Sequence, residues 1–173
     1  MKNELTLAGY KFTLKNIQYG IHSEETVDYM ADLYCNGKLI ATVENDGHGG
    51  CSMARWNHDN LELVRQVEQD VRKVVWLTCK DGTELYYTLG QVADDILELI
   101  ERNKEISRLQ KNALVLEKEG DIYFSLLKYK ASIKDILASN PAIIKQGIKQ
   151  ARKDGWTIVN TNIPEEYLVF AEA

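Results

Sequence analysis

The chain has 173 residues, close to the size of a single domain, which typically spans roughly 100–200 residues. Hydrophobic residues make up 45% of it and charged residues 27%, so the composition allows a packed core and excludes wholesale disorder. The formal net charge of −5 argues against a non-specific duplex-binding protein, which needs several lysine and arginine contacts to phosphates.

Charge is unevenly distributed along the sequence. Residues 59–105 carry 6 basic and 11 acidic groups, whereas residues 106–155 carry 10 basic and 5 acidic groups. The three cysteines, Cys35, Cys51 and Cys79, are too few for a disulfide framework and predict reduced thiols. The sequence contains neither an apolar run near the ~18 residues of a membrane span nor a signal-peptide pattern. We therefore expect a cytoplasmic protein that does not associate with membranes.

The first predicted elements are β-strands. Residues 5–14 alternate between apolar and polar side chains and predict one or two short strands. Residues 26–35 have a clear period of two, Asn36-Gly37 can form a tight turn, and residues 39–44 return as the second strand of a hairpin. Residues 52–56 form either a short strand or an irregular exit segment.

The middle of the chain predicts two helices separated by a second hairpin. Apolar residues at helical spacing predict a helix over residues 59–72. Residues 74–79 and 84–89 are rich in β-formers and flank Asp81-Gly82, a turn sequence. Residues 91–111 give the strongest helical pattern, with acidic residues early and basic residues late, as the helix dipole favours.

The last third predicts shorter elements. Residues 113–117 and 122–130 flank Glu119-Gly120-Asp121 and predict a third hairpin. Residues 133–138 predict a short helix that ends before Asn140-Pro141, and a second helix runs from Pro141 to about Asp154.

A strand over residues 156–162 completes the predicted fold, which belongs to the α+β class. We expect antiparallel β-hairpins packed against two or three helices in a single domain of residues 1–173. Residues 1–111 and 112–173 could form two subdomains of it.

A glycine-rich loop follows the first predicted hairpin. It comprises Asn45, Asp46, Gly47, His48, Gly49, Gly50 and Cys51. Its backbone N–H groups could bind an anion such as a nucleotide phosphate, which would make the loop a ligand site. The loop lacks the lysine of a phosphate-binding loop, however, and its GxGG spacing does not fit the dinucleotide pattern. A demanding turn, in which Asn and Asp hydrogen-bond their own backbone, is the favoured interpretation.

The same loop holds reactive side chains. Cys51 could act as a nucleophile with His48 or His58 as its base, and Asp46 or Asp59 could orient that base. Cysteine and histidine side chains could also bind zinc, but the sequence has no CxxC or HxxxH pair. We predict no catalytic residue, no metal ligand and no cofactor.

Two charged helix faces complete the candidate sites. Lys145, Lys149, Arg152 and Lys153 share one face of the helix after Pro141 and could contact phosphates or an acidic protein. A solvated surface explains their spacing equally well and is favoured. The helix over residues 91–111 carries an acidic set that we expect on its exterior, opposite the apolar stripe. This set comprises Asp94, Asp95, Glu98, Glu101 and Glu105.

The run from Ala31 to Ala41, followed by Asn45 to Cys51, resembles a recurring pattern in small uncharacterised proteins of phages and mobile elements. In that pattern a hairpin leads into an NDGxGG loop, and an acidic amphipathic helix and a strand pair follow. The resemblance implies an intracellular accessory protein of phage or mobile-element origin. It implies no catalytic residue.

The sequence favours a binding protein over an enzyme. We expect it to contact a host protein and to inhibit a host defence system. Two alternatives stay open: a nucleotide- or anion-binding enzyme or ligand sequesterer that uses the loop 45–51, and a nucleic-acid binder that uses the basic segment 128–153. The sequence does not predict an oligomeric state.

Overall fold

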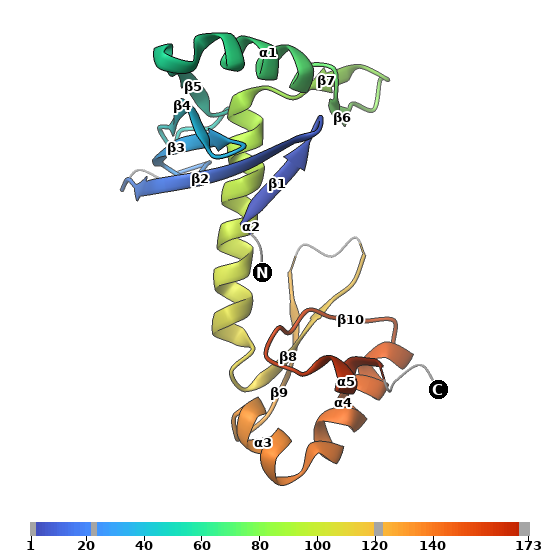
Figure 1. The fold of residues 1–173 in the computed structure, drawn as a ribbon. Coiled ribbons are helices and arrows are strands. Elements are labelled where there is room, and N and C mark those ends of the chain that lie inside the picture. The colour runs from blue at the N-terminus through green and yellow to red at the C-terminus, as the bar shows by residue number, and fades with distance from the viewer. Residues whose placement is uncertain (1–2, 22–23, 120–122, 170–173) are drawn as a thin grey trace. The chain divides into compact units, whose positions relative to one another are not determined.

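The computed structural model describes residues 3–21, 24–119 and 123–169. It confirms the predicted α+β class, with antiparallel sheets and helices (Figure 1). Its contacts divide the chain into two compact units, one ending at Glu101 and the other running from Arg102. The boundary falls within a long helix, α2, which spans Leu89–Leu109. We call them the N-terminal and C-terminal units.

The N-terminal unit is built on a five-stranded antiparallel sheet in which sequential strands are neighbours, in the order β1-β2-β3-β4-β5. The strands are β1 (Glu4–Leu7), β2 (Tyr10–Tyr19), β3 (Tyr29–Cys35), β4 (Lys38–Asn45) and β5 (Met53–Trp56). Asn36 and Gly37, both with positive φ, make the predicted turn between β3 and β4. The predicted first hairpin is therefore confirmed.

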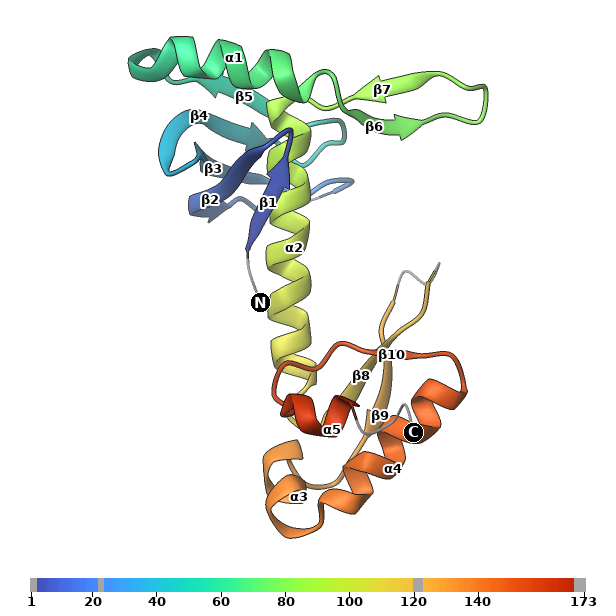
Figure 2. The same cartoon turned by 45° about the vertical axis from the view of Figure 1, so that its right-hand side comes forward.

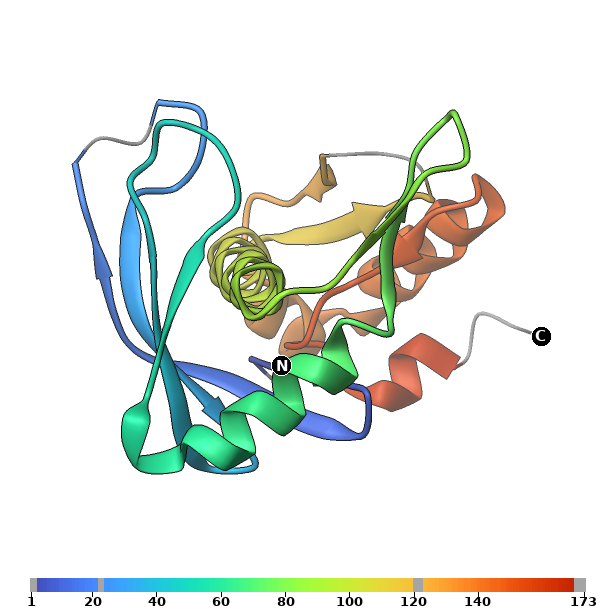
Figure 3. The ribbon, with the colours of Figure 1, turned by 90° about the horizontal axis from the view of Figure 1, so that it is seen from above.

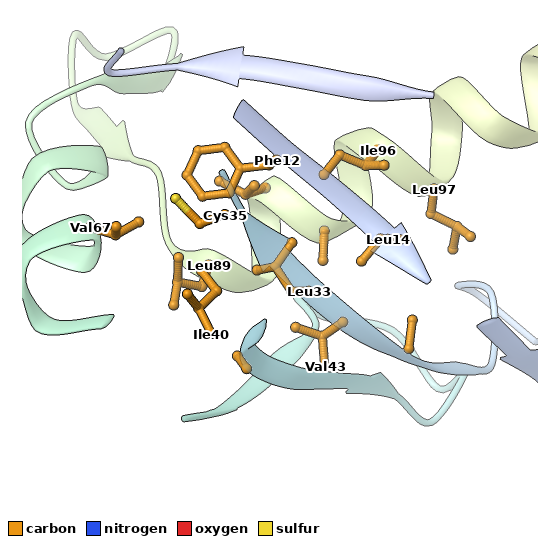
Figure 4. Close-up of a cluster of buried hydrophobic side chains, with 14 of the residues drawn as sticks. Phe12, Leu14, Leu33, Cys35, Ile40, Val43, Val67, Leu89, Ile96 and Leu97 are labelled. Carbon is orange, nitrogen blue, oxygen red and sulfur yellow. The ribbon is translucent and has the colours of Figure 1, made fainter. Parts of the chain in front are cut away.

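One face of this sheet carries the core of the N-terminal unit. The period of two in β3 buries Tyr29, Ala31, Leu33 and Cys35 on that face. Valines of helix α1 (Leu61–Val71) and apolar residues of α2 up to Ile100 pack against them (Figure 4). Viewed from above, the sheet curves beside α2, and α1 crosses one of its ends (Figure 3). Both helices therefore cover the same face of the sheet.

Two short elements connect these parts. A 3₁₀ turn, η1 (His58–Asn60), precedes α1. Between α1 and α2 lies a separate hairpin of β6 (Val75–Thr78) and β7 (Glu84–Tyr86), which extends beyond the sheet and α1 (Figure 2). The predicted second hairpin is confirmed, but Leu89 begins α2 instead of ending a strand.

The C-terminal unit contains a three-stranded antiparallel sheet in the order β10-β8-β9. Its strands are β8 (Ala113–Glu117), β9 (Ser125–Lys128) and β10 (Thr157–Ile158). Its helices beyond α2 are α3 (Ile133–Ser139), α4 (Pro141–Lys153) and α5 (Glu165–Val169). Buried isoleucines of α3 and α4 pack against Leu114 and Leu116 of β8 and form the second core.

Three details of this unit concern the sequence predictions. The predicted turn residues Gly120 and Asp121, with Ile122, lie outside the described residues.

The predicted strand 156–162 is wrong beyond Ile158, because the buried side chain of Asn160 takes over the pairing with β8. Its amide bonds the backbone N–H of Val115 at 2.7 Å and the carbonyl of Ala113 at 2.9 Å. The short helix α5 was not predicted.

Candidate functional site

The loop of residues 45–51 leaves the end of β4 and is shaped by its first residue. Asn45 is 8% exposed, and its side-chain oxygen accepts hydrogen bonds from the Gly47 N–H (3.0 Å) and the Thr26 hydroxyl (2.7 Å). Its amide nitrogen donates to the Gly50 carbonyl at 3.2 Å. Gly47, Gly49 and Gly50 all have positive φ, which side chains disfavour. This geometry is that of the demanding turn expected from the sequence.

The neighbouring segment 24–26 fastens the loop from outside. The backbone N–H groups of Glu24 and Glu25 both donate to the Gly47 carbonyl at 3.0 Å, and the Gly49 N–H donates to the Thr26 hydroxyl at 3.3 Å. A Cβ at Gly49 would stand 2.5 Å from a carboxylate oxygen of Glu25. The two loops therefore form one packed end of the sheet.

This packing occupies donors that an anion would need. The N–H of Gly47 bonds Asn45, that of Gly49 bonds Thr26, and that of His48 bonds a carboxylate oxygen of Asp46 at 3.2 Å. An anion cradle requires such groups to point at the ligand instead. The arrangement therefore favours the interpretation as a structural turn and disfavours a phosphate-binding site.

The side chains proposed for catalysis have other partners. The thiol of Cys51 is exposed and lies 3.1 Å from the side-chain nitrogen of Gln91. The His48 ring nitrogen Nδ1 lies 2.9 Å from the backbone carbonyl of Asp46. Cys35 is buried in the core, and this burial raises its pKa to about 11. Among the residues described, His, Cys, Asp and Glu side chains form no group of three that could hold a metal.

The structure adds a buried polar cluster at the base of the loop, which sequence reasoning missed. The Tyr29 hydroxyl donates to the Asp94 carboxylate at 3.0 Å, and the Ser52 hydroxyl donates to the same carboxylate. The two hydroxyl oxygens lie 2.9 Å apart, and the Ser52 N–H also donates to Asp94, at 3.2 Å. Burial raises the pKa of Tyr29, so its hydroxyl stays protonated as a donor. The cluster ties the loop to α2.

The expected position of Asp94 and Asp95 on the exterior of the helix is therefore corrected. Asp95 is also half-buried and accepts a hydrogen bond from the Tyr87 hydroxyl at 2.7 Å. The start of α2 is buried over a wider arc than the predicted stripe, because Ala93 and Leu97 join the core. In the sequence, the apolar side chains of these two residues were the signal that the buried stripe is wider than predicted.

Glycine allows the close approach of the loop to α2. A Cβ at Gly90, in the first turn of α2, would overlap the backbone carbonyl oxygen of Ser52. Gly90 is buried at this contact. The conformation of the loop and the start of α2 are thus matched to each other.

Two hollows flank the loop. The first, of about 530 Å³, is lined by Tyr19, Met30, Met53 and three carboxylate residues, Asp28, Glu44 and Asp46, among others. The second, of about 400 Å³, is lined by Val27, Leu97 and three further carboxylate residues, Asp94, Glu98 and Glu101, among others. Neither lining contains a lysine or an arginine within the described parts of the chain.

The hollows belong to an acidic unit. Residues up to Glu101 include 9 basic and 17 acidic side chains, a formal charge of −8. Residues from Arg102 onward include 12 basic and 9 acidic side chains, a formal charge of +3. The acidic surroundings of the loop favour positively charged ligands over phosphates.

The predicted basic face lies on α4, in the C-terminal unit. Lys145, Lys149 and Lys153 are exposed, and Arg152 is half-buried. The Lys145 ammonium lies 5.2 Å from the ring centroid of Tyr167, a cation–π contact. The opposite side of α4 buries Ile144 and Ile148, as the sequence predicted.

Comparisons with protein families, with curated proteins and with solved structures find no match to this chain. Within the described residues, none of the helices combines the length and apolarity needed to cross a membrane.

Proposed function

We propose that the chain is a non-enzymatic accessory protein of a phage or mobile element that binds a host protein and thereby inhibits a host defence system. The observation that carries the binding part of this proposal is the hairpin of β6 and β7. The resemblance of residues 31–51 to the NDGxGG pattern of phage and mobile-element proteins supports its origin.

The hairpin exposes large apolar side chains on both of its faces. Val75, Trp76, Leu77, Leu85 and Tyr86 are each between 38% and 47% exposed. The hairpin is a two-stranded sheet, and such a sheet alone is only marginally stable in water. A partner that covers these side chains would bury apolar surface and hold the two strands in place. Exposed apolar patches of this kind commonly mark protein–protein interaction sites.

One side chain anchors the hairpin to the N-terminal unit. Tyr87, which directly follows β7, donates a hydrogen bond from its hydroxyl to the Asp95 carboxylate of α2 at 2.7 Å. This anchoring at the base presents the outer residues Leu77 and Leu85, which are cross-strand neighbours. An ordered apolar surface binds with a smaller entropy cost than a flexible one.

The experiment is affinity capture of the full chain from a lysate of its host, with the partner identified by mass spectrometry. We expect one stable host partner, and a variant carrying Leu77→Ser and Leu85→Ser should recover it at least about tenfold less efficiently. Tyr123→Ser is the matched control, because Tyr123 is 84% exposed and lies in the C-terminal unit.

A second readout tests the consequence for the host. Expression of the chain should raise the plating efficiency of a phage that the host's defence restricts, and the double hairpin variant should not. Recovery of the chain alone, with no effect on defence, would overturn the proposal.

A thermal-shift screen tests the open ligand alternative. Stabilisation by a nucleotide that Gly49→Val abolishes and Lys149→Glu leaves intact would support a ligand site at the loop. The nucleic-acid alternative requires binding that falls steeply with salt, since it depends on the cations of segment 128–153.

A further inference from the structure

The outer face of the five-stranded sheet lies opposite the core that α1 and α2 cover. One row across this face runs through four strands and is formed by Gln18, Met30, Glu44 and Met53. Met30 is 40% exposed and Met53 is 70% exposed. Two thioether side chains thus stand on either side of a carboxylate on a sheet face.

This row opens into the larger of the two hollows beside the loop. Both methionines line it, together with the carboxylate residues Asp28, Glu44 and Asp46. Arg55 pairs with Glu44 from outside the lining, and His48 lies 3.8 Å from the Asp46 carboxylate. Even with Arg55 counted, the formal charge of this part of the face is negative.

The combination of side chains indicates the chemistry of the occupant. Methionine is flexible and polarizable, so it adapts to apolar side chains of different shapes. Carboxylates around a hollow raise the local concentration of cations and repel anions. The volume of about 530 Å³ exceeds what a metal ion needs and suits several side chains of a peptide.

The sheet also indicates how such a peptide can lie. β5 pairs with β4 and forms one edge of the sheet among the described residues. An extended segment beside an edge strand places every second side chain on the same face of the sheet. Side chains of that segment would then reach the row that ends at Met53.

We propose that this face binds an extended basic segment of a partner protein, in which lysine or arginine residues alternate with apolar residues. The apolar side chains contact Met30 and Met53, and the basic side chains lie among Asp28, Glu44 and Asp46. This inference rests on the proposed function, because it names the chemistry of the protein that the chain contacts.

The test uses the full chain and a fluorescent synthetic peptide of alternating lysine and leucine, with binding followed by anisotropy. The peptide should bind, and Met53→Lys should weaken binding at least about tenfold, since it removes an apolar contact and adds a repelled charge. Met53→Leu should bind as the unchanged chain does. Because Met53 is 70% exposed, these changes leave the core intact, which circular dichroism can verify.

Three controls complete the test. Tyr123→Lys adds the same charge to the C-terminal unit and should leave peptide binding within about twofold of its original value. A peptide with glutamate in place of lysine should not bind. A peptide with glutamine in place of leucine should bind at least about tenfold more weakly than the original. Equal binding of the acidic peptide, or an unchanged affinity for Met53→Lys, would overturn the inference.

The hairpin variant separates this inference from the proposed function. The chain with Leu77→Ser and Leu85→Ser should still bind the lysine–leucine peptide. Failure of the original chain to bind the peptide while it recovers a host partner would overturn this inference alone. Peptide binding without any host partner would overturn the proposed function instead.

Discussion

Asp95 shows how single carboxylates couple the hairpin to the rest of the N-terminal unit. It accepts a hydrogen bond from Tyr87, yet its pKa is raised, mainly because it is buried and secondly because Glu98 and Asp94 lie nearby. Burial of the Tyr87 hydroxyl, together with its hydrogen bond to Asp95, raises the pKa of Tyr87 to about 12. At neutral pH the fold therefore holds an ionised carboxylate at a cost in stability.

Asp95→Asn should raise the melting temperature at pH 7, because the neutral amide retains an acceptor for Tyr87 and removes the buried charge. When the pKa of a group is higher in the folded state than in the unfolded state, its protonation stabilises the fold. This contribution is fully present at pH values below the unfolded pKa, and it is lost as the pH rises through the folded pKa. The gain from Asp95→Asn should thus shrink as the pH falls through the folded pKa towards 3.8, and it should be smallest below 3.8. Thermal melts at pH 7 and pH 3 measure the gain and its decrease at low pH. A lower melting temperature of the Asp95→Asn variant at pH 7 would contradict this explanation.

Glu117 provides a control of opposite sign. Its pKa is lowered, mainly by the hydrogen bonds from Arg102, one of which is 2.8 Å long. That contribution is present above the ordinary pKa of 4.5 and is lost as the pH falls through the folded pKa. Glu117→Gln should therefore lower the melting temperature at pH 7 and have little effect at pH 3.

Ser52 tests the buried cluster that ties the loop to α2. Ser52→Ala removes a hydroxyl that is bonded to Asp94 and leaves that carboxylate and Tyr29 short of a partner. We expect a loss of about 1–3 kcal/mol in the free energy of unfolding, measured with urea. Ser107→Ala, which removes one exposed bond to the Asn103 carbonyl, should change it by less than about 0.5 kcal/mol. Equal effects of the two changes would contradict the role of the cluster.

At the scale of elements, the sequence predicted best where the pattern is local. The hairpin of β3 and β4 follows from alternating side chains and Asn36-Gly37. The end of β10 could not be predicted, because the amide of Asn160 replaces strand pairing through contacts about 45 residues away in sequence. A local pattern does not show which distant backbone a polar side chain will bond.

The candidate site was predicted only in part for the same reason. The glycines and Asn45 indicate a turn, and the structure has that turn. The anchoring of the loop to Asp94 depends on a serine and a tyrosine that become neighbours only when the sheet and α2 pack. Helical spacing places Asp94 opposite the apolar stripe and does not show that the hydroxyl groups of Tyr29 and Ser52 bury it.

Gly90 tests the match between the loop and α2. Gly90→Ala would normally stabilise a helix by roughly 1 kcal/mol. Here the added methyl group would overlap the Ser52 carbonyl oxygen, and we expect a net loss of about 1–3 kcal/mol in the free energy of unfolding. Denaturant unfolding measures the change, and a more stable variant would show that the loop can move away from α2 without cost.

At the scale of the whole molecule, the chain joins an acidic unit to a basic one. The N-terminal unit, with a formal charge of −8, holds the hairpin, the loop and both carboxylate-lined hollows. The C-terminal unit, at +3, holds the basic face of α4. This division is consistent with the proposal that the N-terminal unit, which also exposes apolar side chains, binds a basic partner.

The proposed function requires the chain to bind a host protein through the hairpin of β6 and β7. Hydrogen exchange of the full chain, alone and with the captured partner, tests this most directly. We predict that residues 75–86 become protected in the complex, while residues around Tyr123 do not change. Unchanged exchange over residues 75–86 in the presence of a stably bound partner would contradict the claim.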